Sequence, residues 1–305
     1  TQTTPLIVAQ NSSGNELFRI STGPSTSSLF AGFQSGQSIV AGVGNTGFGQ
    51  RTLQATTSGN QNVAIGDSAM LANIDGSNST AVGYAALITN VSGTYNTAIG
   101  TGALSNTLSG YNTALGTGAG SGAVGSTSSA NVFIGAESGQ NNLSANDNTF
   151  VGNSSGKNIT TGDTNVVIGS IPFSSYALTE GSGNIFVGGA GSNVTTGSNN
   201  IFIGGTSLAA SSATASNELK IGGILQGNTS TLAAQFNGAL TVTGILTVAG
   251  NIIPNGAGTL NVGSTTAEFN DLYVGDNNGL RLGLDQDALL AYDETTDDRV
   301  ELTGT

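Results

Sequence analysis

The sequence predicts an all-β protein built as an elongated β-solenoid, of the β-roll or β-helix kind, and three observations lead there. Glycines that follow a short β-type triplet recur about every 17 residues between Gly49 and Gly222. The triplets are rich in Thr, Val and Ile, which favour strands. The chain has 48 glycines in 305 residues and only 8% charged residues. Its abundant Gly, Asn, Ser and Thr are poor helix formers, so few long helices are expected.

Each glycine of the series is predicted to close one rung of about 17 residues, as in NTAIG at 96–100. The series is Gly49, Gly66, Gly83, Gly100, Gly116, Gly135, Gly152, Gly169, Gly188, Gly204 and Gly222. The intervals range from 16 to 19 residues, and a repeat of this period is typical of solenoids. We expect each rung to contain a strand, a corner at the glycine, where a positive φ costs little, a short second strand and a turn. The second strand is expected at Ala69–Met70, Ala86–Leu87 and Ala103–Leu104 in the early rungs.

The residue before each glycine, here the pre-glycine column, is predicted to form the solenoid core because it is always large and apolar. Its members include Ile65, Val82, Ile99, Leu115, Ile134, Val151, Ile168, Val187 and Ile203. The residue three before the glycine, the strand-start column, shares a strand face with it. The asparagine column, four before the glycine, is Asn in most rungs, and we expect its amides to form a ladder along the stack.

The residue two before each glycine, the middle column, lies on the opposite strand face and is predicted to pack against sister chains. Its members are Ala64, Ala81, Ala98, Ala114, Phe133, Phe150, Phe186 and Phe202, with Val167 among the phenylalanines. Exposed phenylalanines in several rungs would form an apolar stripe of the kind that marks an interface. The change from Ala to Phe predicts two sub-sections, joined near residues 117–130.

Four segments are expected along the chain. Residues 1–40 form a connector or β-cap, and residues 41–225 form the solenoid. Residues 226–267 form a β shaft, since a six-residue pattern there ends at Gly244, Gly250 and Gly256. Residues 268–305 alternate apolar and polar residues and are predicted to be a further β segment.

Charge and composition exclude several classes of partner. The net charge is −12, which disfavours nucleic acid and anionic membranes. Residues 268–305 hold 10 acids and 2 bases and so contribute −8 of it. No apolar run is long enough to span a bilayer. The absence of cysteine excludes a disulfide framework and fits an extracellular protein. Both ends look cut, so we expect a piece of a longer chain or a processed form of one.

The sequence predicts no catalytic, cofactor-binding or metal-binding residue. His and Cys are absent, which removes the usual nucleophile–base pairs. The carboxylate pairs Asp285–Asp287 and Asp293–Glu294 leave a glycosidase as a minor alternative. Calcium is the one cofactor left open, at two places rich in oxygen ligands, although solvated acidic turns are the preferred interpretation. These places are Asp293, Glu294, Asp297 and Asp298, and Asp276, Asn277 and Asn278.

GVGNTG at 42–47 matches a dinucleotide-loop pattern. It stands in an array of glycine-containing rungs with no helix expected after it, so we interpret it as structural.

With these residues in view, the NTAIG-type rungs resemble the head repeats of trimeric autotransporter adhesins and similar repeats of phage tail fibres. The longer rung with NTAIGxxAL is closer to the tail-fibre type. LTVTG…LTVAG at 241–250, with TLNVGSTTAEFNDLYVGDNNGLRLG after it, resembles the shaft upstream of the chaperone domain in many tail fibres. The resemblance covers roughly residues 41–284. A membrane-anchor barrel and a C-terminal chaperone domain are not recognisable, which leaves open which of the two families is closer.

The resemblance implies a parallel homotrimer that serves as a structural and adhesive fibre segment. The predicted function is to present a receptor-binding surface, for a cell-surface receptor or glycan, outside a cell on a virion tail fibre. A bacterial surface trimeric adhesin is the first alternative. A monomeric β-solenoid module that binds a glycan or ice is the second. An enzyme is not expected.

Overall fold

The computed structural model describes the solenoid almost continuously. The described residues are 7–12, 14, 16–22, 28–170, 178–188, 193–205 and 208–222, with the shorter ranges 225–228, 233–236, 280–282, 288–293 and 299–304. The chain divides into two compact units, Thr1–Leu240 and Thr241–Thr305. Every regular element in the described residues is a β-strand, which confirms the predicted all-β class.

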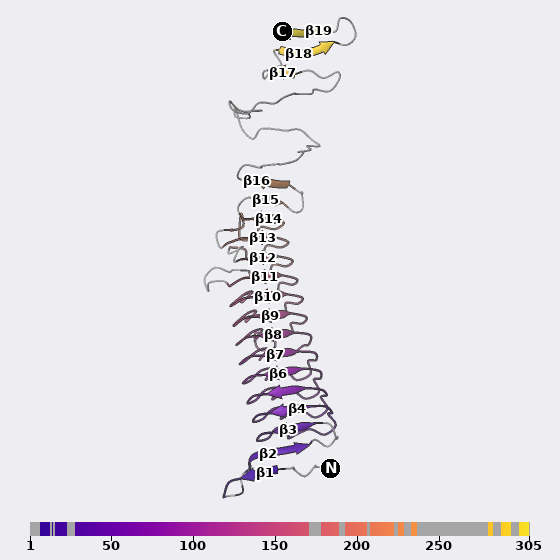
Figure 1. Ribbon diagram of the computed structural model, residues 1–305, viewed down its shortest axis with the longest axis vertical. Helices are drawn as coiled ribbons and strands as arrows, with labels where there is room; N and C mark the ends of the chain where they lie inside the picture. The colour runs from indigo at the N-terminus through magenta and orange to yellow at the C-terminus, as the bar shows by residue number, and fades with distance from the viewer. Residues whose placement is uncertain are drawn as a thin grey trace. The chain divides into compact units, whose positions relative to one another are not determined.

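Twelve strands stack in parallel and in sequence order within the first unit (Figure 1). They are β3 (Leu29–Ala31), β4 (Thr46–Phe48), β5 (Val63–Ile65), β6 (Thr80–Val82), β7 (Thr97–Ile99), β8 (Thr113–Leu115), β9 (Val132–Ile134), β10 (Thr149–Val151), β11 (Val166–Ile168), β12 (Ile185–Val187), β13 (Ile201–Ile203) and β14 (Glu218–Ile221). Each strand pairs with the equivalent residues of the next rung, as Thr97 does with Thr113. This is the predicted β-solenoid of about 11 turns. The stack includes residues 29–40, which were predicted to belong to the N-terminal connector or β-cap.

Antiparallel strands continue the sheet at both ends of the parallel stack. β1 (Ile7–Gln10) pairs with β2 (Glu16–Thr22), and β2 pairs with β3. At the other end β14 pairs with β15 (Leu225–Asn228), and β15 pairs with β16 (Ala233–Phe236). The first and last parallel strands therefore do not present bare hydrogen-bonding edges, which would otherwise invite aggregation.

The second unit contains a three-stranded antiparallel sheet. Its strands are β17 (Leu280–Leu282), β18 (Ala288–Asp293) and β19 (Arg299–Gly304). The glycines of the predicted shaft, Gly244, Gly250 and Gly256, lie outside the described residues.

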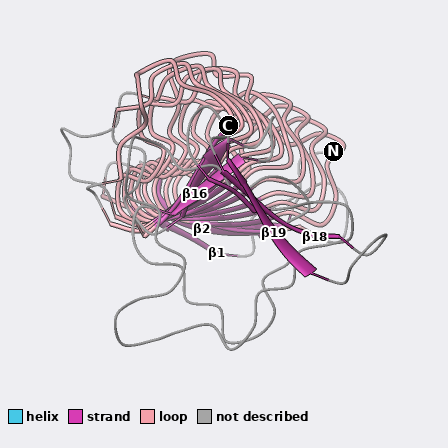
Figure 2. Ribbon diagram, turned by 90° about the horizontal axis from the view of Figure 1, so that it is seen from above, coloured by secondary structure: helices cyan, strands magenta, loops and turns pink. Residues whose placement is uncertain are grey.

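One short strand per rung is the only regular element of the described coils, so the predicted second strand is wrong. Figure 2 shows the strands gathered on one side of the coil and turns making up the rest. Met70, Leu87 and Leu104, expected in the second strand, have φ between +50° and +52°. Left-handed residues bend the chain and cannot extend a strand. Backbone hydrogen bonds still join the turns of successive rungs, as from Met70 N–H to the Ala86 carbonyl.

The middle column forms the core of the solenoid, which reverses the prediction for two columns. Ala64, Ala81, Ala98, Ala114, Phe133, Phe150, Phe186 and Phe202, expected between chains, are fully buried inside the coil of a single chain. Ile65, Ile99, Leu115, Ile134, Ile168 and Ile203, expected in the core, are exposed, and Val82, Val151 and Val187 are half-buried. The alternation of the strand was correct, but the choice of the inner face was not. Residues two apart share a face, so the buried asparagine column must share the inner face with the middle column.

The asparagine column forms the predicted ladder. The side-chain amide of each asparagine donates to the Oδ1 of the preceding one, over 3.0–3.4 Å, at seven steps of the stack. The same Oδ1 accepts the backbone N–H of the next asparagine, as between Asn165 N and Asn148 Oδ1 at 2.8 Å. The buried amides are therefore satisfied along the stack, as buried polar groups require.

Candidate functional site

The candidate site is the outer face of the strands, which we call the strand face. It consists of the pre-glycine column and the strand-start column from β4 to β13. Side chains of the pre-glycine column remain 36% to 62% exposed in seven of these rungs, including Phe48, Leu115 and Ile134. In-register pairing places each of these residues directly beside its counterpart in the next rung. An apolar column therefore runs continuously along the solenoid.

The strand-start column adds threonine and aliphatic side chains to the same face. Thr80, Thr97 and Thr113 follow one another in three consecutive rungs. Val132, Val166 and Ile185 occupy the equivalent places later in the stack. No strand triplet between β4 and β13 contains a charged residue. The strand face is therefore uncharged and largely apolar. Such a surface more often marks an interaction site than free solvent exposure.

Charged groups lie beside the strand face or at its end. Arg51 pairs with Asp67 at 3.1 Å, and both side chains are more than a third exposed. Hydrogen bonding from Ser68 lowers the pKa of Asp67, burial opposes this, and Arg51 lowers it further. Lys157 pairs with Glu137 at 2.8 Å. Partly exposed surface pairs of this kind contribute little to stability.

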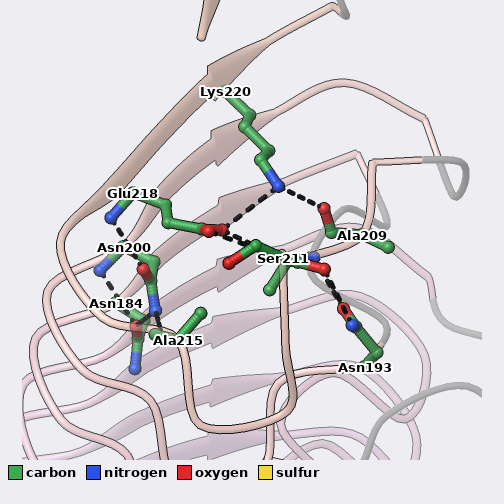
Figure 3. A network of polar contacts seen from close by, with 9 residues as sticks. Asn184, Asn193, Asn200, Ala209, Ser211, Ala215, Glu218 and Lys220 are labelled. Atoms are coloured by element: carbon green, nitrogen blue, oxygen red, sulfur yellow. Dashed lines mark hydrogen bonds and ion pairs between the residues drawn. The ribbon is translucent and has the colours of Figure 1, made fainter. Parts of the chain in front are cut away.

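The last parallel rung replaces the apolar middle column with a charged residue (Figure 3). Lys220 stands where the preceding rung has Phe202, and its ammonium lies 5.3 Å from the centroid of that ring. The same ammonium donates to the Ala209 carbonyl at 2.6 Å and pairs with Glu218 at 3.1 Å. Both Glu218 oxygens accept the Ser211 N–H at 3.2 Å. This cluster, the Lys220 cap, covers the end of the phenylalanine core with satisfied polar groups.

The pKa of Glu218 reflects this environment. Burial raises the pKa of the carboxyl, but hydrogen bonds from Ser211 and Lys220 and the Lys220 charge outweigh burial and hold it below the ordinary value. The ionised form is therefore the one that the cap stabilises.

The candidate metal and catalytic residues lie in the part of the chain whose side chains the structure does not describe. Asp285, Asp287, Asp297, Asp298, Glu294, Asp276, Asn277 and Asn278 lie outside the described residues, and the side chain of Asp293 is not described. Elsewhere in the described ranges, no group of three or more His, Cys, Asp and Glu is placed to hold a metal ion. GVGNTG at 42–47 leads into β4, and within the described rungs no helix follows it. Nor does any helix among the described residues have the length and hydropathy to cross a bilayer.

Sequence reasoning missed three features: the strand face as the exposed one, the Lys220 cap, and a stacked pair of exposed tyrosines, Tyr95 and Tyr111. A signal for each exists in the aligned rungs. Lys220 is the one charged residue in the middle column, and the two tyrosines occupy the same place in successive rungs, directly before Asn96 and Asn112.

Comparison with protein-family models, with curated proteins and with solved structures finds no match to this chain.

Proposed function

We propose that this chain is a structural and adhesive segment of an extended extracellular fibre, in which three parallel copies associate through their strand faces. The observation that carries the proposal is the continuous, uncharged apolar column of the strand face, exposed in a single chain. Rungs spaced by about 4.8 Å extend this column over roughly 43 Å from β4 to β13. Exposed apolar surface of this length is normally covered by another chain.

The resemblance of the rungs to tail-fibre and trimeric-adhesin repeats supports the choice of a homotrimer. The fibre would present a receptor-binding surface on a virion, or, as the alternative, on a bacterial cell. No catalytic role is proposed, since the strand face carries no acid, base or nucleophile apart from threonine hydroxyls. Stability of such a fibre segment derives from each rung packing on its neighbours.

Native mass measured by light scattering tests the proposal. The full chain is expected at about three times 30.0 kDa. Ile99→Asp with Ile134→Asp should reduce it to the mass of one chain, because a trimer would bury six unpaired charges. Far-UV circular dichroism should stay unchanged, since both side chains are exposed in the single chain.

Thr101→Asp is the control, because it adds one such charge two residues beyond Ile99, past the glycine corner. It should leave the trimer intact. A wild-type chain that is monomeric, or a double variant that remains trimeric, would contradict association through the strand face.

A monomeric binding module is the second candidate, and the consecutive Thr80, Thr97 and Thr113 favour it. Ranks of threonine beside Val82, Ile99 and Leu115, paired in register on one sheet face, form a regular surface that a repetitive ligand such as ice would match. A monomeric wild-type chain that shows thermal hysteresis, abolished by Thr97→Asp, would establish this candidate in place of the fibre.

A further inference from the structure

Two exposed tyrosines form a stacked pair on the surface of the solenoid. The ring centroids of Tyr95 and Tyr111 lie 5.1 Å apart with planes inclined by 18°. The residues remain 53% and 64% exposed. They come from successive rungs and each directly precedes a buried asparagine of the ladder, Asn96 or Asn112. The rigid ladder therefore fixes the backbone from which both rings project.

The backbone at this column disfavours tyrosine. Tyr95 and Tyr111 have φ of +59° and +65°, a left-handed conformation that favours Gly, Asn and Asp over bulky residues. Most other rungs have small residues at this place. The column reads Gly44, Gln61, Asn78, Tyr95, Tyr111, Ala130, Asp147, Thr164, Gly183, Asn199 and Asn217. The backbone therefore gives no reason for two adjacent tyrosines, and residues kept in unfavourable conformations cluster at functional sites.

The flanking positions leave the pair accessible. On one side the column continues with Asn78, and on the other with Ala130, neither of which carries a large side chain. Each ring uses one face for the other tyrosine. Since the positions next to the pair in the column hold only Asn78 and Ala130, a flat ligand has room to approach the second face. The negative face of an aromatic ring attracts polarised C–H groups, and the C–H face of a pyranose ring supplies them.

The surrounding chemistry selects a neutral saccharide. The three cations with described side chains, Arg51, Lys157 and Lys220, are each paired with a carboxylate. No free cation among them is left to bind a sulfate, phosphate or sialic acid. Hydroxyl and amide side chains of the adjoining positions, Asn78, Thr94 and Thr113, are the kind of polar groups that orient a sugar over an aromatic platform. The net charge of −12 also disfavours an anionic ligand.

We propose that Tyr95 and Tyr111 form a stacking platform for a neutral pyranose ring of a surface glycan. This inference rests on the adhesive role proposed above and gives it a ligand class. It does not depend on whether the chain is a trimer.

The test uses the full chain on an array of neutral glucose-, galactose- and mannose-containing oligosaccharides, with sialylated and sulfated ones beside them. Oligosaccharides that bind are then titrated in solution by tyrosine fluorescence, which is readable because the chain has six Tyr and no Trp. The wild-type chain should bind at least one neutral oligosaccharide. Tyr95→Asn with Tyr111→Asn should weaken it at least tenfold. Asn is the residue of this column at Asn78, so the variant should fold.

Tyr84→Asn is the control, because Tyr84 is equally exposed at 60% but belongs to another column. It should leave binding unchanged. Saturation-transfer NMR on the wild-type chain provides a second readout that needs no variant, since the sugar protons should receive magnetisation from tyrosine rings. Failure of the wild-type chain to bind any neutral oligosaccharide, or equal binding by the double variant, would overturn the proposal.

Native mass is recorded for every variant. A double variant that loses its oligomeric state would identify the tyrosines as chain-to-chain contacts and overturn the glycan site. A monomeric wild-type chain that binds through the pair would overturn the trimer and leave the glycan site standing.

Discussion

In the core, side-chain volume is exchanged between two positions of a rung: where one residue is large, the other is mostly small. The middle column faces a turn column four residues after the corner glycine, which reads Gly36, Leu53, Met70, Leu87, Leu104, Gly120, Gly139 and Gly156. Phe30, Phe133 and Phe150 have Gly in the turn of their own rung, whereas Ala64, Ala81 and Ala98 have Met or Leu. Ala114 is followed by Gly120, where a Cβ would lie 2.3 Å from the ring of Phe133 in the next rung. Phe202, followed by Leu208, departs from this relation. A Cβ on Gly156 would lie 2.4 Å from the ring of Phe150. The two kinds of rung therefore fill similar space by different means, as close packing demands.

Gly156→Leu should destabilise the chain by about 1–3 kcal/mol, because the new side chain overlaps Phe150. Phe150→Ala should cost about 3–5 kcal/mol through the cavity it leaves. The double variant should cost less than the sum by at least about 1 kcal/mol. The backbone permits it, since Leu87 and Leu104 adopt the same positive φ in their rungs. Chemical denaturation of the four proteins measures the coupling.

Gly118→Leu is the control for this cycle, since it also has a positive φ but its Cβ would meet only the Gln140 side chain at 3.8 Å. Combined with Phe150→Ala, it should be additive. Additivity in the Gly156 cycle as well would show that the exchange of volume does not operate.

The asparagine ladder makes a second prediction. Asn148→Ala removes the acceptor of the Asn165 backbone N–H and the donor to Asn131 Oδ1. Buried groups left without partners should cost about 2–4 kcal/mol. Asn148→Ser should cost less, because Ser79 in its own rung accepts the Asn96 N–H at 3.1 Å. Equal unfolding free energies for the Ser and Ala variants would contradict this account of the ladder.

Residue patterns predicted the rung, its corner glycine and the ladder, but not which face of the strand lies inside. Alternation divides a strand into two faces and does not label them. Size was misleading, because the larger residues of Ala-containing rungs lie outside. The inverse relation between Phe150 and Gly156, or Ala81 and Leu87, contained the answer, since only residues that share a confined space need to compensate for each other.

At the scale of elements, the two ends of the stack are built differently from its interior rungs. The N-terminal end turns antiparallel at β2, and the C-terminal end turns antiparallel at β15 after the Lys220 cap. The sequence predicted parallel rungs well because they repeat, and it predicted the ends poorly because each occurs once. Terminal repeats of solenoids are atypical for the same physical reason, since they cover a core that continues on one side only.

Acid should loosen the Lys220 cap before the interior of the stack. The pKa of Glu218 is lower in the folded chain than its ordinary value of 4.5. Its contribution to stability is therefore complete above that value and is lost as pH falls through the lower folded pKa. Hydrogen exchange, corrected for the intrinsic pH dependence, should show the Ser211 and Glu218 amides losing protection over this range.

Glu218→Gln should lower the exchange protection of the same amides at neutral pH. Asp67→Asn, in the exposed pair with Arg51, should leave that protection unchanged. Loss of protection spread uniformly along all rungs would contradict a local role for the cap.

At the scale of the whole molecule, the solenoid is a sum of rungs that contact only their neighbours. Deletion of residues 84–100, a complete rung between Gly83 and Thr101, should therefore leave a folded chain with slightly lower stability. It joins Ala81 to Ala114 in the middle column and keeps every register. Deletion of residues 84–91, which ends within a turn, should abolish folding because it shifts the asparagine and middle columns out of register. Circular dichroism and thermal unfolding distinguish the two deletions, and equal behaviour would contradict independent rungs.

The direction of the backbone hydrogen bonds in the stack has a mechanical consequence. They join rung to rung, so tension applied along the stack pulls on these bonds lengthwise and opens them a few at a time. Each rung that yields would release about 17 residues, or roughly 55 Å of contour length. A tether built this way lengthens under load in equal steps as rungs unfold from its ends, while the remaining rungs keep their spacing. Such steps would give a regular sawtooth in single-molecule force measurements.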